Sequence, residues 1–369
     1  MSSANAHTVV VLPGDGIGLE VTAQARRVLE WASDQDGMAL NLVDRHYGNE
    51  AYKRSGEVLT DETLADVLAA DAVLFGASGT NDNDDIPREV RKRGSLLRMR
   101  KEMDVFANLR PVRMPEALLD ASPLVPERAR GTDMIFVREL TSGLYFGQPK
   151  MIEDLPDGSQ RGVDTQAYTT GEIARVADFA FELARSRSGK LHSVEKSNVM
   201  ESGRLWRQVV SARHADHSDI ELIHMLGDNC GMQLVKNPGQ FDVILADNMF
   251  GDILSDVAGG VMGTLGMLPS ASLSAPGADG RRKAFFEPVH GSAPDIAGQG
   301  IANPLAAIQS AGMMLRLALD APALADRVDR AIDTVLAAGV RTADIARPGT
   351  TPVTTAGMGD AILAALVDG

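Results

Sequence analysis

The segment FGDILSD places two carboxylates, Asp252 and Asp256, four residues apart. Residues at that spacing lie on the same face of a helix, where two like charges cost roughly 0.2–0.5 kcal/mol. A divalent cation bound between them would turn the repulsion into a binding site, because Mg²⁺ and Mn²⁺ prefer such oxygen ligands. The alternative is a solvated acidic helix face. The flanking segments, Val243–Ala246 and Val257–Gly266, are apolar or rich in glycine, which favours a pair of metal ligands.

The composition limits the class of protein. With 369 residues, 44% of them hydrophobic and 23% charged, the chain has room for two or three domains and is typical of a globular enzyme. A net charge of −14 argues against nucleic acid or a membrane as partner, so we expect lysines and arginines to act locally on a small anion. Cys230 is the one cysteine, which excludes an internal disulfide and fits the cytoplasm. Met1–His7 lack signal-peptide features, and no apolar stretch reaches the roughly 18 residues of a membrane span.

Short apolar runs alternate with longer amphipathic segments along the chain. The predicted strands are Thr8–Leu12, Ala72–Gly76, Met134–Val137, Leu191–Val194, Ile220–Met225 and Val243–Ala246. The predicted helices include Gly18–Ala32, Thr60–Ala69, Thr170–Ser186, Leu305–Leu319 and Ala323–Ala338, with Asn303 as N-cap and Pro304 as first helical residue before the fourth of them. Such alternation is typical of an α/β fold with a largely parallel sheet.

The glycine-rich loop LPGDGIG follows the first predicted strand. A dinucleotide-binding Rossmann fingerprint reads G-x-G-x-x-G. Gly14 and Gly16 fit it, but the last required position is Leu19, and the third glycine comes early, at Gly18. The loop is therefore not a Rossmann signature. Asp15 within it marks either the edge of a cofactor site or a plain tight turn.

Two motifs, RMRKEMDVFANLRP and MIFVREL, contain the arginines Arg98, Arg100, Arg110 and Arg138. A buried arginine at a strand end, as predicted for Arg138, is costly unless it is paired. Its partner is either a protein carboxylate such as Glu139 or Asp104, or a substrate carboxylate, and each bidentate pair contributes about 1.5–3 kcal/mol.

Tyr145 and Lys196 lie in two further motifs, TSGLYFG and VEKSNVMES. Lys196 follows a predicted strand, where it is either a surface residue or a base. Near a bound cation and low-dielectric walls its pKa would fall, and it could then accept a proton.

Together these motifs resemble the β-decarboxylating dehydrogenases, the family of 3-isopropylmalate and isocitrate dehydrogenases. LPGDGIG, RKEMDVFANLRP, VRELTSGLYFG, FGDILSD and FEPVHGSAPDIAGQGIANP occur in the family's order and spacing, over nearly the whole chain. The resemblance implies an isopropylmalate-dehydrogenase-like two-domain fold with a largely parallel central sheet and a cleft between the domains. Residues 1–105 plus 263–369 would form the cofactor-binding domain, and 106–262 the substrate and dimerisation domain, with an arm around 139–168.

The resemblance also implies roles for individual residues. The malate carboxylates would be bound by Arg100, Arg110 and Arg138. Mg²⁺ or Mn²⁺ would be held by Asp228, Asp252 and Asp256. The catalytic residues would be Tyr145, which protonates the enolate, Lys196, which takes the hydroxyl proton, and Asp228. Lys196 and Asp228 would come from the partner subunit of a homodimer with a shared active site.

For the cofactor, the family's binding loop matches Glu287, His290, Gly291, Ser292, Ala293, Asp295 and Asn303. Asp295 is the discriminating position, because a carboxylate accepts the ribose 2′-hydroxyl of NAD and repels the 2′-phosphate of NADP. NAD is therefore the expected cofactor.

For the substrate, Leu96, Leu97 and Val199 match the positions that face an isopropyl group. The resemblance thus implies oxidative decarboxylation of (2R,3S)-3-isopropylmalate to 2-oxo-4-methylpentanoate in leucine biosynthesis. Two leucines would leave the third carboxylate of isocitrate unpaired, which argues against that substrate. Burial of an isopropyl group contributes roughly 2–3 kcal/mol, so some turnover of D-malate is expected as well.

Four positions depart from the family's pattern: the loop Gly76–Asp85, Arg93, Glu195 and Gly231. The first two are expected beside the substrate, where they would change specificity. The alternative substrates are therefore D-malate, tartrate or another 3-substituted malate. A non-catalytic regulatory subunit or a dicarboxylate-binding protein is a further alternative, which the intact tyrosine, lysine and aspartates disfavour.

Overall fold

The computed structural model describes residues 6–35, 38–79 and 85–368. The expectations for Met1–His7 and for the loop at 76–85 therefore fall largely or partly outside the described residues. The chain divides into two compact units. Unit 1 comprises Met1–Val105, Met114–Arg130 and Gly259–Gly369, and unit 2 comprises Phe106–Arg113 and Gly131–Ala258. Among the described residues, no helix has the length and apolar character needed to cross a membrane.

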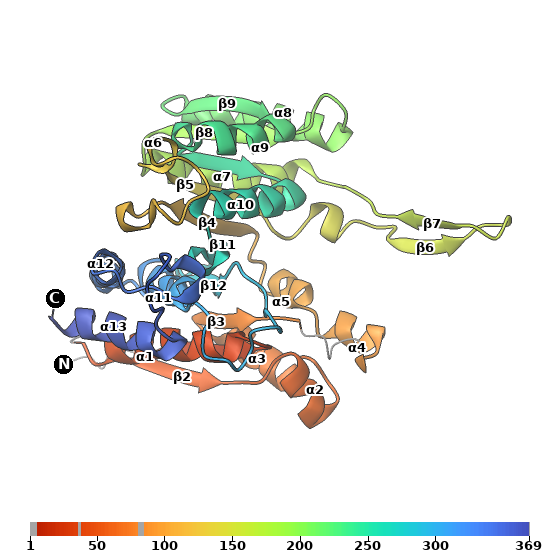
Figure 1. The fold of residues 1–369 in the computed structure, drawn as a ribbon. Helices are drawn as coiled ribbons and strands as arrows, with labels where there is room; N and C mark the ends of the chain where they lie inside the picture. Colours follow the sequence, from red (N-terminus) through yellow and green to blue (C-terminus); the bar gives the residue numbers. More distant parts are fainter. Residues whose placement is uncertain (1–5, 36–37, 80–84, 369) are drawn as a thin grey trace. The chain divides into compact units, whose positions relative to one another are not determined.

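In unit 1, five strands pair in the order β2-β1-β3-β12-β11 (Figure 1). Their bounds are β1 His7–Gly14, β2 Leu40–Asp44, β3 Ala72–Ala77, β11 Pro269–Pro276 and β12 Arg282–Pro288. All pair in parallel except β11 with β12. The run Val9–Leu12 in β1 is fully buried, as expected for a strand of a parallel sheet that is covered on both faces.

The helices of unit 1 are α1 Gly18–Ser33, α2 Asn49–Ser55, α3 Asp61–Ala69, α4 Arg88–Arg93, α5 Leu96–Glu102, α6 Pro126–Ala129, α11 Leu305–Leu317, α12 Pro322–Ala337 and α13 Thr355–Asp368. Helix α1 packs on β1 and β3, and α11 packs on β11 and β12. Helix α5 begins after Ser95, whose hydroxyl accepts a hydrogen bond from the backbone N–H of Arg98, a typical N-cap. Its first turn therefore carries Leu96 and Leu97.

In unit 2, the strand order is β4-β5-β10-β8-β9. The bounds are β4 Ala107–Arg113, β5 Asp133–Glu139, β8 Lys190–Glu195, β9 Glu221–Leu226 and β10 Val243–Ala246. Only β4 and β5 are antiparallel. The helices are α7 Thr170–Arg185, α8 Glu201–His214, α9 Gly227–Lys236 and α10 Asn248–Met262, whose last turn belongs to unit 1. A capping box of Thr169 and Glu172 begins α7.

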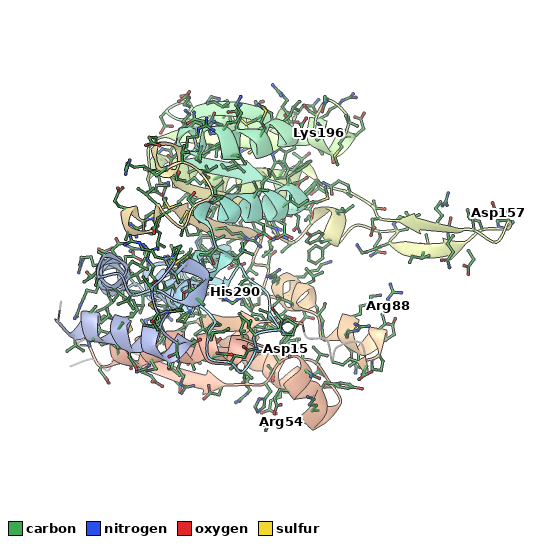
Figure 2. All side chains as sticks on the ribbon, viewed as in Figure 1. Asp15, Arg54, Arg88, Asp157, Lys196 and His290 are labelled. Atoms are coloured by element: carbon green, nitrogen blue, oxygen red, sulfur yellow. The ribbon has the colours of Figure 1, made fainter. Side chains whose placement is uncertain are left out.

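A hairpin extends from unit 2 between β5 and α7. Its strands, β6 Met151–Asp154 and β7 Gln160–Val163, pair only with each other, in antiparallel register. Asp157 lies at its tip, away from the other strands of the unit (Figure 2). Ile152 is 71% and Met151 44% exposed, so the hairpin presents apolar side chains at its surface.

The predicted α/β fold with mostly parallel strands is confirmed. Each of the six predicted strands and five predicted helices is present, with small shifts at the ends. Helix α11 begins at Leu305 as predicted, but its N-cap is Pro304 and not Asn303. The Asn303 Oδ1 accepts a hydrogen bond from the Leu305 N–H at 3.0 Å. Six strands, β2, β4, β6, β7, β11 and β12, were not predicted. In β4 the sequence ANLRPVR interrupts apolar alternation with asparagine, arginine and proline, which hides the strand.

Residues 114–130 lie in unit 1, whereas the boundaries expected from the sequence place them with 106–262. The guanidinium of Arg341 donates to both carboxylate oxygens of Asp120, at 3.1 and 2.9 Å, and Arg347 donates to the same carboxylate at 2.7 Å. These bonds fasten the segment to the C-terminal part of unit 1. Asp120 and Arg341 are 221 residues apart, so no local pattern indicates their pairing.

Candidate active site

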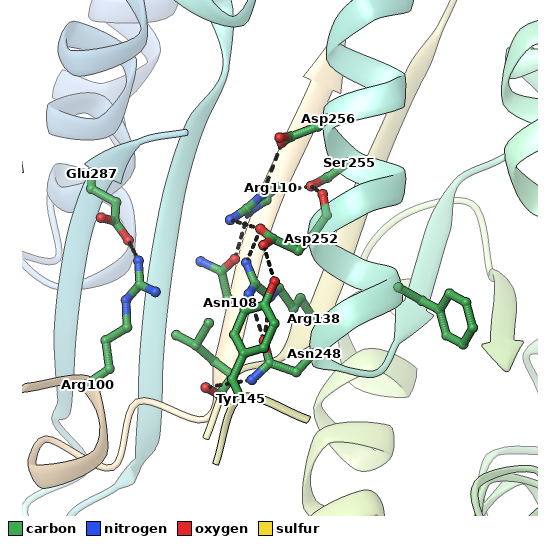
Figure 3. Close-up of polar contacts among 12 residues, drawn as sticks. Arg100, Asn108, Arg110, Arg138, Tyr145, Asn248, Asp252, Ser255, Asp256 and Glu287 are labelled. Carbon is green, nitrogen blue, oxygen red and sulfur yellow. Dashed lines mark hydrogen bonds and ion pairs between the residues drawn. The ribbon is translucent and has the colours of Figure 1, made fainter. Parts of the chain in front are cut away.

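One face of α10 carries the paired aspartates. Asn248, Asp252 and Asp256 recur every four residues, so they form one stripe along the helix (Figure 3). Asp252 accepts hydrogen bonds or ion pairs from three donors: Arg138 Nη1 at 2.5 Å, Arg110 Nη2 at 3.0 Å and the Tyr145 hydroxyl at 2.7 Å. The structure thus brings three sequence-predicted site residues to the carboxylate of a fourth.

Arg110 reaches this carboxylate from β4. Its Nε donates to Asn108 Oδ1 at 2.9 Å, and its Nη1 donates to Ser255 Oγ at 2.8 Å and lies 3.4 Å from Asp256 Oδ1. Asn108 and Arg110 are two residues apart in the strand and therefore share a face of the sheet. The arginine is buried, so each of these acceptors lowers the cost of desolvating its charge.

Arg138 reaches the same carboxylate from the end of β5 and is 2% exposed. Its Nε and Nη2 donate to Asn248 Oδ1 at 3.0 and 2.6 Å. The expected pairing with a protein carboxylate is present, but the partner is Asp252. Glu139 instead accepts hydrogen bonds from Thr141 N and Oγ1 and from Ser142 N.

Tyr145 ends the short 3-10 helix Gly143–Tyr145 that follows β5. Burial raises the pKa of its hydroxyl, and the hydrogen bond to Asp252 raises it further. A raised pKa keeps the phenol protonated at neutral pH, so Tyr145 can donate a proton at this point of the site.

The donor set on α10 fits a divalent cation. Asp256 has 53% of its side chain exposed. Its pKa is raised by burial and by the nearby charge of Asp252, although Arg110 and Arg138 lower it. A cation would relieve the repulsion between the two carboxylates. Within a single chain, the described residues contain no group of three or more His, Cys, Asp or Glu that could hold a metal.

The third predicted ligand, Asp228, lies apart from these two, in the first turn of α9. Lys196 Nζ donates to its Oδ1 at 2.7 Å, and this bond lowers the pKa of Asp228. Lys196 follows β8 (Figure 2). Within one chain, Lys196, the predicted base, is therefore paired with Asp228, the predicted metal ligand. The contacts of Asp252 described above include neither of them.

Unit 1 carries the remaining arginine. Arg100, on α5, forms a buried ion pair with Glu287, near the end of β12 (Figure 3). Arg100 was expected to bind the substrate and Glu287 the cofactor, and a contact between them was not predicted. Leu96 and Leu97 are half-buried at the start of the same helix. Arg100 lies three and four residues after them and so shares their helix face.

The predicted cofactor loop begins after β12 and packs against the glycine loop. Ile17 N donates to the carbonyl of Ser292 at 2.8 Å. Gly16 has a φ of +56°, and a Cβ at this position would lie 2.1 Å from the same carbonyl oxygen. Glycine is thus required at Gly16 both for its backbone conformation and for the close approach of the loop.

Other groups of this loop are available to a ligand. Asp295 and Gly291 are exposed, and Ala293 adopts a φ of +39°. His290 Nδ1 lies 2.9 Å from the carbonyl of Gly291, while its buried Nε2 lacks a hydrogen-bond partner among the described residues. Burial lowers the pKa of this histidine, so it is a neutral donor or acceptor. An exposed carboxylate beside polar backbone groups suits a ribose of a dinucleotide.

Asn303 closes the loop. Its Nδ2 donates to Asp344 Oδ2 at 3.1 Å, and Thr264 Oγ1 donates to the same oxygen at 2.6 Å. Asp15, by contrast, turns inward: its carboxylate accepts hydrogen bonds from Asn49 N at 2.7 Å and Gly79 N at 3.0 Å. Of the two alternatives for Asp15, these bonds favour the tight turn.

Arg93, one of the departures from the family's pattern, forms an exposed ion pair with Glu57 at 3.3 Å. Together with Glu89, Val90, Lys92 and Arg98 it lines a cavity of about 480 Å³. The described part of the neighbouring loop at 76–85 does not include residues 80–84.

The chain is similar to known proteins over nearly its whole length. A family model described as isocitrate/isopropylmalate dehydrogenase matches residues 8–362. The 3-isopropylmalate dehydrogenase 1 of Bradyrhizobium diazoefficiens is 53% identical over 98% of this chain and 96% of its own, and the 3-isopropylmalate dehydrogenase of Rhodospirillum rubrum is 55% identical over 96% of both. The crystal structure of isocitrate dehydrogenase from Methylococcus capsulatus has a TM-score of 0.84 and 31% identity, and covers 98% of this chain and 99% of that one.

Such similarity over the full length of the relatives defines the class of protein. The molecule is an oxidoreductase, a β-decarboxylating dehydrogenase. The chain belongs to the isocitrate/isopropylmalate dehydrogenase family, which confirms the resemblance seen in its motifs.

Proposed function

We propose that the protein catalyses the NAD-dependent and divalent-metal-dependent oxidative decarboxylation of (2R,3S)-3-isopropylmalate, a step of leucine biosynthesis. The observation that carries the proposal is the convergence of Arg110, Arg138 and Tyr145 on Asp252. Two relatives that match over nearly their whole length are named 3-isopropylmalate dehydrogenase, which supports this choice of substrate.

Arg110 and Arg138 bind the carboxylates of the malate, together with Arg100. A guanidinium presents its donors in a fixed fork that matches a carboxylate bidentately. Both buried arginines now direct donors to Asp252, and a substrate carboxylate competes for the same donors. Leu96 and Leu97 face the isopropyl group with Val199, which is 69% exposed in this chain and gains cover when the substrate binds.

Asp252 and Asp256, with Asp228, are the ligands of Mg²⁺ or Mn²⁺. When bound, a divalent cation lowers the pKa of the substrate hydroxyl and polarises the carbonyl that forms from it. The charges balance: two arginines and two aspartates sum to zero, and a divalent cation with a dianionic malate adds nothing to that sum.

Two side chains of the protein move protons. Lys196 takes the proton of the substrate hydroxyl, directly or through Asp228, to which its Nζ donates. After CO₂ leaves, the enolate needs an acid, and Tyr145 supplies its phenolic proton. The raised pKa of this tyrosine supports the assignment, because the phenol must be protonated at the start of each turnover.

NAD accepts the hydride and is bound by the loop that contains Glu287, His290, Gly291, Ser292, Ala293, Asp295 and Asn303. The exposed carboxylate of Asp295 accepts the ribose 2′-hydroxyl and repels a 2′-phosphate. NAD is therefore preferred over NADP.

A homodimer with a shared site completes the account. Unit 2 exposes apolar side chains on α9 and α10, of which Met232 is 49%, Val235 44% and Ile253 53% exposed. Large apolar side chains of this kind are typical of a subunit interface. In such a dimer, Lys196 and Asp228 are supplied by the partner. A cytoplasmic location fits the single cysteine, Cys230, which is free and buried.

D-malate and tartrate form a second candidate class, which the basic cavity beside Arg93 favours. The test is kcat/KM for 3-isopropylmalate, D-malate and tartrate with NAD and Mn²⁺, measured by NADH absorbance. Burial of the isopropyl group predicts a preference for 3-isopropylmalate of roughly a hundredfold. An equal or reversed preference would favour the second class, and no NADH from any of the three acids would contradict the proposal.

A further inference from the structure

Each of the two candidate substrate-binding arginines of unit 2, Arg110 and Arg138, lies against a buried asparagine. Asn248 Oδ1 accepts the Nε and Nη2 of Arg138, and Asn108 Oδ1 accepts the Nε of Arg110. Both asparagines are at most 1% exposed. Asn108 also lies directly opposite Arg138 in the β4–β5 register. Each guanidinium group therefore donates its Nε–H to the amide oxygen of an asparagine, which is a neutral acceptor.

The amide of Asn248 can face in only one direction. Its Nδ2 donates to the carbonyls of Leu140 and Ser142, at 3.1 and 3.0 Å. The opposite orientation would place the NH₂ group against the guanidinium and the oxygen against two carbonyl oxygens, so all four hydrogen bonds would be lost. Both amide hydrogens and the amide oxygen are used, which fixes the rotation of the Arg138 guanidinium about its own axis.

The position of Asn248 connects three parts of the site. It begins α10, one helical turn before Asp252. It also holds the turn at 140–142 that leads to Tyr145. Its backbone N–H donates to the Tyr168 hydroxyl at 2.9 Å, so Asn248 is also bonded to the segment that precedes α7.

A neutral acceptor has a consequence that a carboxylate would not have. Asparagine orients the guanidinium without adding a negative charge beside it, so it does not itself reduce the attraction of Arg110 and Arg138 for an anion. An aspartate at either position would hold the same N–H groups and would also neutralise a positive charge in a poorly solvated site. At position 248 it would also set a carboxylate against two carbonyl oxygens.

We propose that Asn248 and Asn108 are positioning residues that orient Arg138 and Arg110 through Nε while leaving their charge available to the carboxylates of the substrate. The inference rests on the proposed function, because it takes these arginines as the substrate-binding groups.

The test compares Asn248→Asp with wild type in the full-length protein, with Asn41→Asp as matched control, because Asn41 is exposed on β2. The readouts are the KM for 3-isopropylmalate, the KM for NAD, and the dissociation constant of 3-isopropylmalate with Mn²⁺ by calorimetric titration without NAD. Weakening a charge-assisted contact predicts a rise of about ten- to a hundredfold in the KM and the dissociation constant of the acid. The KM for NAD stays within about twofold, and the control matches wild type.

A purely structural role predicts a different result. It would lower the thermal midpoint of Asn248→Asp while the folded fraction kept the wild-type KM for the acid, and that result would overturn the inference. Asn108→Asp serves as the second variant if Asn248→Asp does not fold, and it must raise the KM for the acid in the same way. If wild type turns over the acid and Asn108→Asp keeps its KM, the inference fails while the proposed function stands. If wild type turns over none of the acids, the proposed function itself has failed.

Discussion

The hydroxyl of Tyr145 donates a hydrogen bond of 2.7 Å to Asp252 Oδ2. The acid expected from the resemblance and one of the expected metal ligands are thus in direct contact within one chain. The bond holds the phenolic proton at the carboxylate that also receives Arg138 and Arg110. In the proposed reaction this contact places the proton donor beside the ligand of the cation that stabilises the enolate.

Replacing Tyr145 by phenylalanine removes the phenolic hydroxyl and its proton but hardly changes the volume of the side chain. We expect kcat for 3-isopropylmalate to fall by about 10²–10⁴-fold, the usual contribution of a positioned general acid. Steady-state kinetics measure the effect, and Tyr52→Phe on α2 removes the same atom elsewhere. A kcat for Tyr145→Phe within about threefold of wild type would rule out the assigned role.

Mixing of two inactive variants tests the shared site. Lys196→Met keeps Tyr145, and Tyr145→Phe keeps Lys196, so a mixed dimer rebuilds one complete site from the two subunits. Random exchange makes half of the dimers mixed, and each has one working site, so about a quarter of wild-type activity should return. Activity is measured after co-refolding or co-expression of the two chains. If the mixture stays as inactive as its parents while mass analysis shows mixed dimers, Lys196 does not act across the interface.

Gly16→Ala should weaken the binding of the dinucleotide but not that of the acid substrate. The added Cβ would lie 2.1 Å from the Ser292 carbonyl at a φ of +56°, so the loop that carries Asp295 must shift. We expect the KM for NAD to rise about tenfold or more and the KM for the acid to change little. Gly171→Ala is the matched control, because nothing lies within 4 Å of its Cβ position. Equal effects of the two substitutions on the KM for NAD would argue against the loop contact as the cause.

His192 should make the protein less stable in mild acid. Burial, together with a smaller effect of the charge of Lys190, lowers the pKa of this side chain to about 4. The unfolded chain takes up the proton below about pH 6.5, but the folded chain only below about pH 4. The contribution present above pH 6.5 is therefore lost as the pH falls, at about 1.4 kcal/mol per pH unit.

Urea unfolding of wild type and His192→Leu at about pH 7 and about pH 5 measures this difference. The variant should lose less free energy of unfolding between the two pH values than wild type loses. Buried Glu139 and Asp247 have pKa values raised to about 7 and about 6. Their effect has the opposite sign, so only the difference between the two proteins isolates the histidine. His46→Leu, at an exposed position, should behave like wild type, and a parallel pH dependence of wild type and His192→Leu would contradict the argument.

The charged part of the site was predictable because its signal is local. The four-residue spacing of Asp252 and Asp256 fixes their common face whatever the rest of the chain does. The neutral part was missed. Asn108 and Asn248 carry no charge to attract notice, yet their spacings to Arg110 and to Asp252, two along a strand and four along a helix, are regular enough to have indicated them.

Pairings between distant segments could not be predicted. Arg100 and Glu287 are 187 residues apart, and their contact depends on how α5 packs beside β12. The same holds for Asp120 and Arg341, which assign residues 114–130 to unit 1. Strand β4 was not predicted because its asparagine and arginine, which belong to the candidate site, replace the apolar residues that mark a strand.

The most direct test of the central claim is the dependence of turnover on a divalent cation. The protein is freed of metal with a chelator, and NADH formation from 3-isopropylmalate and NAD is followed as Mn²⁺ is added back, for wild type and for Asp256→Asn. The account predicts no turnover without the cation, full recovery of wild type with it, and a need for at least about tenfold more Mn²⁺ in the variant. Undiminished turnover by the metal-free enzyme, or identical Mn²⁺ requirements of the two proteins, would contradict it.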